Sequence, residues 1–345
     1  DDDTLTGSGV NPTLNFTFVQ DADIQSSVIT PTLNGIETVN VNFAAQQGKA
    51  LLDAQDSTGI ENVNLSRITD ATTWAGVTNL GAEATNLSLN NTNSPAGLVD
   101  FTYLNSALAG ADDEVNLTLN NVTAGTVYVG AENPTPGVGV ETVNLESTGS
   151  ANRVGQLDVE DIETLLISGD QALTLGGSNP TFRPGANQVE ATRYQDGLDS
   201  TSGSLDTIDA SALDAGLTIN LGEEVVANQD GTSGKAVDFS FTGTAHDDTV
   251  RLLNGLNKGD TFDLGEGNDT VALFQSATAG ELNGVEVVEL RSGHDAGNGA
   301  DTINFDASIA PDLEGIVIRN EGQDFIGAPG EWTSVPEAGT FNLTK

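Results

Sequence analysis

Apolar and polar residues alternate along most of this chain, in short segments bounded by Gly, Asn, Thr, Ser or Asp. Examples are ETVNVNF, NLSLN, VNLTLN, LLISG, LTINLG and GIVIRN. A period of two places successive side chains on opposite faces of a β-strand, so one face is buried and the other contacts solvent. Helical patterns are scarce, and the plausible ones cover 44–56 and 98–110. We therefore expect an all-β protein with few short helices.

One phrase recurs within this pattern: a turn residue, an apolar residue, an acid, one further residue and then a strand. The copies are GIETVNV from Gly35, GIENVNL from Gly59, GVETVNL from Gly139, DIETLLI from Asp161, SLDTIDA from Ser204 and GVEVVEL from Gly284. Their separations are close to multiples of about 20 to 24 residues. A fixed period in this range is typical of a solenoid, in which each coil adds a strand to one core. The sequence therefore predicts an elongated β-solenoid or β-roll of short strands.

The phrase also predicts which side chains are buried. The expected core positions are Val39, Val41, Val63, Leu65, Val143, Leu145, Leu165, Ile167, Val288 and Leu290. The acids at 37, 61, 141, 163 and 286 are expected to form one outward-facing line along the turn edge. Such a line either binds cations or keeps an exposed edge from pairing with other sheets.

A second motif, Asp-Thr followed by an apolar residue, is concentrated in the C-terminal half. Before Asp269 and Asp301, glycines stand at a spacing of two residues. Glycine allows turn conformations in which backbone carbonyls face an ion, and carboxylates are hard ligands that suit Ca²⁺. We therefore expect several calcium ions here, with the candidate ligands Asp247, Asp248, Asp260, Asp263, Gly265, Gly267, Asn268, Asp269, Gly297, Gly299 and Asp301. The alternative is a set of ordinary Gly-Asp turns in an Asp- and Gly-rich β protein.

The two motifs suggest two regions. Residues 1–195 are expected to form a β-solenoid of degenerate coils, and residues 196–345 a calcium-binding β-solenoid or β-roll.

Charge narrows the choice of partners. The chain has 51 acidic and 11 basic residues, which give a formal net charge of -40. Self-repulsion of this size disfavours a compact state unless cations neutralise part of it. It also argues against nucleic acid and anionic membranes as partners, because proteins that bind them are basic at the contact. No cysteine is present for disulfides or thiolate sites, and no apolar run approaches the ~20 residues of a membrane helix.

Catalytic patterns are weak. The chain contains His246 and His294, which both lie in the expected ion-binding turns, and it contains no G-x-S-x-G, H-E-x-x-H or P-loop. The acid pairs Asp112–Asp113 and Glu223–Glu224 could act as glycosidase carboxylates, but some pairing is expected in so acidic a chain. We expect no enzyme, and keep a β-helical polysaccharide-active enzyme as the lesser alternative.

Two surface patterns give no functional signal. The N-x-S/T sites at Asn15, Asn64, Asn86, Asn116 and Asn121 are expected by chance in a chain this rich in Asn and Thr. An ice-binding solenoid would carry a regular ladder of exposed threonines, which the sequence does not reveal.

The recurring GIETVNL-like phrase, the Gly-x-Gly-x-Asp turns and the cysteine-free strands rich in Thr, Asn and Gly together resemble RTX-type calcium-dependent bacterial surface-layer (S-layer) proteins. The chain departs from the full G-G-x-G-x-D motif at Leu264 and Ala296, and it shows no clear C-terminal secretion signal.

This resemblance implies a secreted, extracellular protein that self-assembles on the bacterial cell surface into a calcium-stabilised lattice. The main partner would be the protein itself, with cell-surface polysaccharide bound through another region. The abrupt start, DDDTLTGSG without Met, fits the interior of a longer protein or a processed product. A secreted calcium-dependent adhesin or a fibre protein of the biofilm matrix is the alternative.

Overall fold

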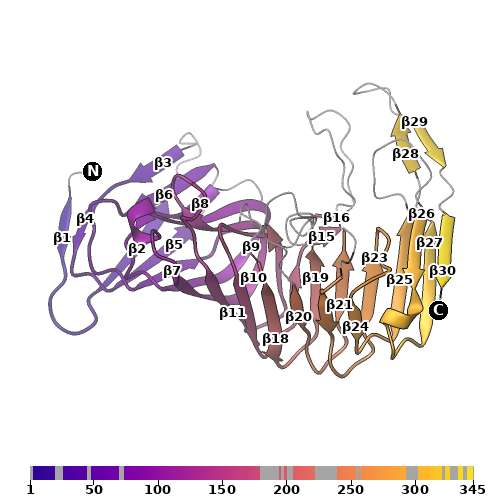
Figure 1. Ribbon diagram of the computed structural model, residues 1–345. Coiled ribbons are helices and arrows are strands. Elements are labelled where there is room, and N and C mark those ends of the chain that lie inside the picture. Colours follow the sequence, from indigo (N-terminus) through magenta and orange to yellow (C-terminus); the bar gives the residue numbers. More distant parts are fainter. Residues whose placement is uncertain are drawn as a thin grey trace.

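The protein is a stack of parallel β-strand coils in an elongated body (Figure 1). The computed structural model describes residues 3–19, 26–44, 48–69, 74–178, 194–195, 198–199, 205–221, 239–253, 256, 258–292, 302–320, 323–326, 333–336 and 340–344. In this part of the chain the helical elements are two 3₁₀ turns, η1 (Asn105–Ala107) and η3 (Ala307–Ile309). The predicted all-β, solenoid-like fold is confirmed.

Two parallel sheets form the walls of the solenoid. Sheet I contains β2 (Thr13–Val19), β5 (Thr38–Ala44), β7 (Asn62–Ser66), the first parts of β9 (Asn86–Tyr103) and β10 (Glu114–Ala131), β11 (Thr142–Thr148), β13 (Thr164–Gly169), β18 (Thr207–Leu213), β20 (Ser240–Thr242), β22 (Thr261–Asp263) and β24 (Glu281–Asn283).

Sheet II forms the opposite wall. It contains β3 (Ser26–Ile29), β6 (Lys49–Asp53), β8 (Trp74–Leu80), the second parts of β9 and β10, β12 (Asn152–Val159), β14 (Leu173–Leu175), β17 (Leu198–Asp199), β19 (Leu217–Leu221), β21 (Thr249–Leu252), β23 (Thr270–Leu273), β25 (Val287–Ser292) and β27 (Gly315–Asn320).

Short two-stranded pairs accompany the two walls. The parallel pairs are β1 (Thr4–Thr6) with β4 (Thr32–Asn34) and β26 (Thr302–Asp306) with β30 (Thr340–Thr344). The antiparallel pairs are β15 (Gly177–Ser178) with β16 (Tyr194–Gln195) and β28 (Gln323–Ile326) with β29 (Thr333–Pro336).

The coils differ in length. Side chains that stack in register are 24 residues apart between β5 and β7, but 30 apart between β9 and β10. Thr164 pairs directly with Thr207, so the long interval between the phrases at 161 and 204 is one coil and not two. That pairing, and the pairing of β14 with β19, cross the expected boundary at 195/196, so the sheets are continuous there.

One hydrophobic core fills the space between the sheets and extends from Phe18 to Ala310. The rings of Phe18 and Phe43 stack with centroids 5.5 Å apart, and Phe241 stacks on Phe262 at the same distance. Every core position predicted from the recurring phrase is buried. The register read from the period-two pattern is therefore correct.

Sharp corners join the two sheets. Arg67, Asn91 and Asn121 have positive φ angles of 62°, 47° and 57° at the end of sheet I. Asn tolerates this left-handed conformation better than most residues, because its short polar side chain can bond locally. A strand of sheet I can therefore turn within one residue and continue as a strand of sheet II, as β9 and β10 do.

The two expected helices are wrong. Residues 49–53 form β6 within 44–56, while 98–103 belong to β9 and 105–107 form η1 within 98–110. Ala50, Leu51 and Leu52 are all buried, so this run lacks the alternation that identifies a half-exposed strand. Pairing with β3 and β8 on both sides outweighs its local preference.

The expected single line of acids is also corrected. Glu37 lies beside Glu61, and Glu141 lies beside Glu163, but the two pairs occupy columns offset by two residues. Glu286 precedes a strand of sheet II and lies elsewhere. The acidic positions therefore form separate short rows.

Candidate functional site

Six of the eleven candidate calcium-binding residues lie in two of three stacked turns that lead from sheet I to sheet II. These turns cover residues 243–248, 264–269 and 284–286, and they connect β20 to β21, β22 to β23 and β24 to β25. Their flanking strands pair in register, so the turns lie one above another.

Close stacking explains the glycines. Gly265 has φ +91°, and a Cβ placed there would lie 2.1 Å from the carbonyl oxygen of Thr244. At Gly267 a Cβ would lie 2.8 Å from the carbonyl oxygen of His246. Both contacts are too short for a side chain, so the spacing of two glycines is required by the packing of one turn on the next.

The acids of these turns bind backbone N–H groups of the preceding coil. The Leu217 N–H donates to Asp248 Oδ1 at 2.8 Å, and the Asp248 N–H donates to Asp269 Oδ1 at 2.7 Å. The Asp269 N–H in turn donates to Glu286 Oε2 at 2.8 Å. Each carboxylate therefore replaces the ladder hydrogen bond that the backbone cannot make at the entry to a strand.

The same device occurs elsewhere in the solenoid. Glu141 Oε2 accepts the Asp113 N–H at 2.8 Å, and Asp260 Oδ1 accepts the Phe239 N–H at 3.4 Å. The acid of the recurring phrase can thus stabilise the fold without an ion, which supports the reading of these segments as structural turns.

Asp269 differs from the other capping acids. It is fully buried, and its Oδ2 has no hydrogen-bond partner. Burial raises the pKa of Asp269 to about 6, and the negative charges of Asp248, Glu286 and Asp247 add to the rise against the opposing Asp248 N–H. An ionised Asp269 is therefore an anion whose second oxygen would be stabilised by a cation.

Asp248 is more fully satisfied. Its Oδ2 accepts the Thr244 N–H at 2.7 Å, and its Oδ1 accepts both the Leu217 N–H and the Thr244 hydroxyl. Burial raises the pKa of Asp248 as well. Two further candidates also bind backbone. Asp247 Oδ1, in the first turn, accepts the Asn268 N–H at 2.9 Å, and Asp263 Oδ1, at the end of β22, accepts the Gly265 N–H at 3.3 Å.

The remaining candidates lie apart. Asp260 precedes β22 and lies at the opposite edge, where sheet II leads to sheet I. Gly297, Gly299 and Asp301, together with His294, fall outside the described residues. The fold therefore brings together six residues of the predicted set, with Asp263 at the end of the adjoining strand. The six are Asp247, Asp248, Gly265, Gly267, Asn268 and Asp269.

These residues offer some, but not all, of the features of a calcium site. Within the described ranges, no group of three or more His, Asp or Glu side chains is arranged to hold a metal. The buried Asp269 Oδ2 is nevertheless an unused hard ligand, and the carbonyl oxygens of Thr244 and His246 belong to the adjoining turn. Oxygen donors of this kind suit Ca²⁺, which takes both carboxylate and backbone ligands.

A second cluster, which the sequence did not indicate, lies on the outer face of sheet II. Gly76, Asp100, Tyr128 and Asp158 are register partners on β8, β9, β10 and β12. The Trp74 indole donates a hydrogen bond to Asp100 Oδ2. Reading 98–110 as a helix concealed this arrangement, because it removed Asp100 from the outward positions of a strand.

Burial shapes the electrostatics of this cluster. It raises the pKa of Asp100 to about 6, although the Trp74 hydrogen bond opposes the rise, and Glu132 adds to it. Burial also raises the pKa of Tyr128, with added contributions from the charges of Glu160 and Asp158. A carboxyl group with a raised pKa beside aromatic side chains, such as Asp100 next to Trp74, is a feature that general acid catalysis can use.

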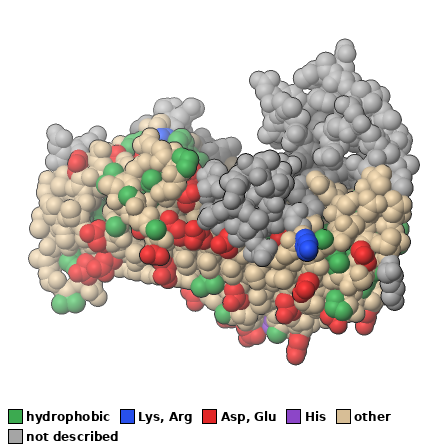
Figure 2. Space-filling model, viewed as in Figure 1, with side chains coloured by type: hydrophobic (Ala, Val, Ile, Leu, Met, Phe, Trp, Pro, Cys, Tyr) green, Lys and Arg blue, Asp and Glu red, His purple; other side chains and the backbone are tan. Residues whose placement is uncertain are grey.

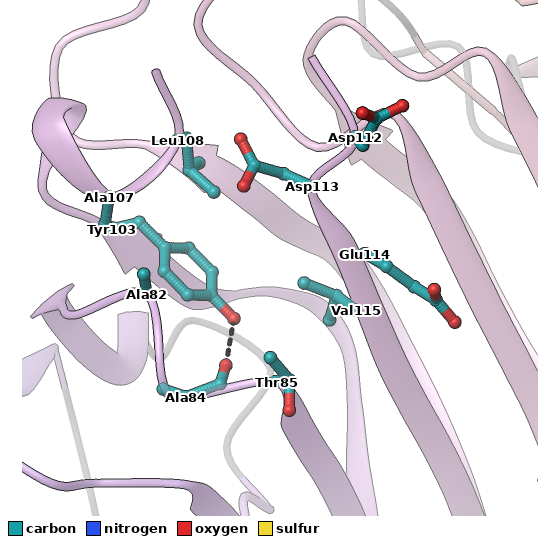
Figure 3. Close-up of a pocket in the computed structure, with 10 residues that line it drawn as sticks. All are labelled: Ala82, Ala84, Thr85, Tyr103, Ala107, Leu108, Asp112, Asp113, Glu114 and Val115. Carbon is teal, nitrogen blue, oxygen red and sulfur yellow. Dashed lines mark hydrogen bonds between the residues drawn. The ribbon is translucent and has the colours of Figure 1, made fainter. Parts of the chain in front are cut away.

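A cavity of about 260 Å³ lies at the turn edge between β9 and β10 (Figure 3). Its apolar lining includes Ala82, Leu108 and Tyr103, whose hydroxyl donates to the Ala84 carbonyl at 2.6 Å. In Figure 3 the carboxylate of Asp113 points toward Leu108, and Asp112 projects away. The Asp112–Asp113 pair is thus not a facing pair of carboxylates. Glu223 and Glu224 lie outside the described residues.

Comparisons with protein-family models, with curated proteins and with solved structures find no match for this chain. Among the helices of the described residues, none has the length and apolar character that a membrane crossing requires.

Proposed function

We propose that this chain is a structural protein of the bacterial cell surface, secreted and assembled with other copies of itself into a calcium-stabilised S-layer lattice. The observation that carries the proposal is the stack of coils around one core, in which acidic side chains accept hydrogen bonds from the backbone of the adjacent coil. A repetitive scaffold of this kind provides extended side surfaces for contacts between copies.

The calcium part of the proposal depends on Asp269. We expect its Oδ2 to bind Ca²⁺, because the ion would compensate a buried anion that has acidic neighbours. The folded protein would gain stability by mass action in millimolar Ca²⁺.

Electron microscopy with and without Ca²⁺ tests the assembly. We expect ordered sheets in millimolar Ca²⁺ that dissolve after addition of a chelator and return when Ca²⁺ is restored. Filaments in place of sheets would favour a matrix fibre. Monomers at every calcium concentration would contradict self-assembly.

Calorimetry with Asp269→Asn tests the ion site. We expect the variant to bind at least one calcium ion fewer and to lose part of the calcium-dependent rise in melting temperature. Asp56→Asn is the matched control, because Asp56 is an exposed acid in the turn after β6, several coils away from the stacked turns. Equal calcium binding by Asp269→Asn and the wild type would rule out this site.

The cluster on sheet II favours one second candidate, a polysaccharide-active enzyme. Glycosidases use two nearby carboxyl groups. Asp100 and Glu160 both contribute to the raised pKa of Tyr128, so both lie near its side chain, and burial raises the pKa of each acid. A panel of neutral and acidic polysaccharides tests this candidate. Release of reducing ends by the wild type, and its loss in Asp100→Asn with an unchanged fold, would support catalysis over a scaffold.

A further inference from the structure

Outward side chains of sheet I form straight columns across the N-terminal coils. One column contains Asn15, Asn40, Asn64, Ser88, Thr118 and Glu146, each the register partner of the next. The neighbouring column contains Thr13, Thr38, Asn62, Asn86, Asn116 and Asn144. The N-x-S/T sites at 15, 64, 86 and 116 therefore lie in two adjoining columns, although the sequence alone gave no reason to expect order.

Hydrogen bonds join several neighbouring members of each column. Asn40 Nδ2 donates to Asn15 Oδ1 at 2.8 Å, and Asn64 Nδ2 donates to Asn40 Oδ1 at the same distance. In the second column Asn116 donates to Asn86 at 3.0 Å and Asn144 donates to Asn116 at 2.8 Å. The amides are thus ordered before any partner arrives, which reduces the entropy that binding would cost.

We call this surface the amide face and define it as the outward positions of residues 13–17, 38–42, 62–66, 86–90, 116–120 and 144–148. Its outward side chains are Asn, Thr or Ser at every position except Glu146. One more acid, Glu114 of β10, borders the face and accepts a hydrogen bond from Asn144 Nδ2 at 2.6 Å. Later strands of the same sheet carry outward acids, including Asp209, Asp263 and Glu281. The neutral character is therefore confined to the N-terminal part of sheet I.

The rest of the molecule is strongly acidic. Figure 2 shows acidic side chains spread over the visible described surface, with few Lys and Arg side chains among them. Two copies that each carry a net charge of -40 repel each other most strongly through acidic surfaces. The amide face is a surface on which this repulsion is small at close range.

We infer that the amide face is a contact surface for a second copy of this chain, with the amide faces of the two copies opposed. The inference rests on the proposed self-assembly and assigns it a surface. Amides and hydroxyls both donate and accept hydrogen bonds, so the face is complementary to itself, as a two-fold contact requires.

The size of the face is sufficient. Strands spaced by about 4.8 Å and rising about 3.3 Å per residue make it about 29 Å by 17 Å, or about 500 Å² on each copy. The pair would bury about 1,000 Å², which is near the lower limit for a specific protein interface. A neutral polysaccharide is a weaker choice of occupant, because the face lacks the aromatic rings on which sugars stack.

Sedimentation equilibrium of the whole protein in millimolar Ca²⁺ tests the inference. We expect the wild type to associate, and the double variant Asn40→Asp/Asn64→Asp to associate at least about tenfold more weakly because it opposes like charges. Asn116→Asp, at an exposed position of the other column, provides a second test if the double variant does not fold. Thr261→Asp is the control, since it adds a charge to an exposed position of sheet I outside the amide face.

Each outcome has a distinct meaning. Equal association of the wild type and the amide-face variants would overturn the inference while leaving self-assembly in place. A wild type that is monomeric with and without Ca²⁺ would overturn both. A further outcome is a monomeric wild type that binds insoluble cellulose while the double variant does not. That result would show that the amide face binds a neutral glycan and not a second copy.

Discussion

At the residue scale, the Gly-x-Gly-x-Asp turn has a packing explanation that needs no ion. Gly265 and Gly267 allow the turn to rest on the carbonyls of Thr244 and His246, and Asp269 caps the Asp248 N–H. The sequence indicated the positions of these residues but could not separate a calcium turn from a stacked turn, because both require the same glycines and the same acid. The unpaired Asp269 Oδ2 is a feature of the folded protein that no sequence pattern indicates, and it is the atom on which the proposed calcium site depends.

Gly265→Ala should destabilise the protein by about 2 kcal/mol or more, since the new Cβ meets the Thr244 carbonyl and the backbone is left-handed. Urea denaturation measures this change. Gly315→Ala is the control, because a Cβ at Gly315 meets no atom within 4 Å. Equal effects of the two substitutions would show that the turns are not closely stacked.

Asp100 should make stability depend on pH. Its pKa is about 6 in the folded protein and about 3.9 in an unfolded chain, so the folded state binds more protons between these values. The stability that this group contributes is complete below about pH 4 and is lost as pH rises through about 6. The loss is about 3 kcal/mol at most.

Denaturation in calcium-free buffer from pH 4 to pH 7 measures this effect. Asp100→Asn should flatten the profile by that amount, while Asp269 continues to contribute a dependence of the same sign. An unchanged profile in Asp100→Asn would mean that the pKa of Asp100 is the same in the folded and the unfolded protein.

At the scale of single elements, the alternation of apolar and polar residues identified strands well where one face of the sheet is exposed to solvent. The phrase at 35–41, with Val39 and Val41 buried and Asn40 outward, is one example. The method failed at β6 and at the second part of β9, where consecutive residues are buried on both faces of the sheet. Periodicity cannot separate such a run from a short helix, because the deciding contacts come from neighbouring coils.

Asn152 joins three strands, so its loss should weaken all of them. Its side-chain oxygen accepts the Val122 N–H at 2.7 Å, and its amide donates to Ser147 Oγ at 2.9 Å and to the Thr148 carbonyl at 3.0 Å. Asn152→Ala should cost about 2 to 3 kcal/mol, because buried backbone groups lose their partners.

Chemical denaturation of Asn152→Ala and Asn144→Ala provides the comparison. The side chain of Asn144 donates to Glu114 Oε1 and Asn116 Oδ1 on the exposed outer face, so its replacement should cost less than about 1 kcal/mol. A similar loss in both variants would contradict the structural role of Asn152.

At the scale of the whole molecule, composition indicated a repulsive chain and the phrases indicated a solenoid, but neither located the neutral surface. The amide face arises from register: residues separated by 24 to 30 positions become neighbours only when coils of unequal length stack in phase. The turns between strands differ in length, so the coils differ in length as well. The sequence period of about 20 to 24 residues does not show these differences.

The perpendicular arrangement of strands and long axis has a mechanical consequence. The chain enters at one end of the stack and leaves at the other (Figure 1), so tension between its ends acts on one terminal coil at a time. The hydrogen bonds of that coil would break one after another, and the next coil would bear the load only after they had broken. A coil of 24 residues would release about 80 Å of extended chain at each step. Under tension such a molecule would lengthen stepwise, and the unfolding of each coil would dissipate mechanical work.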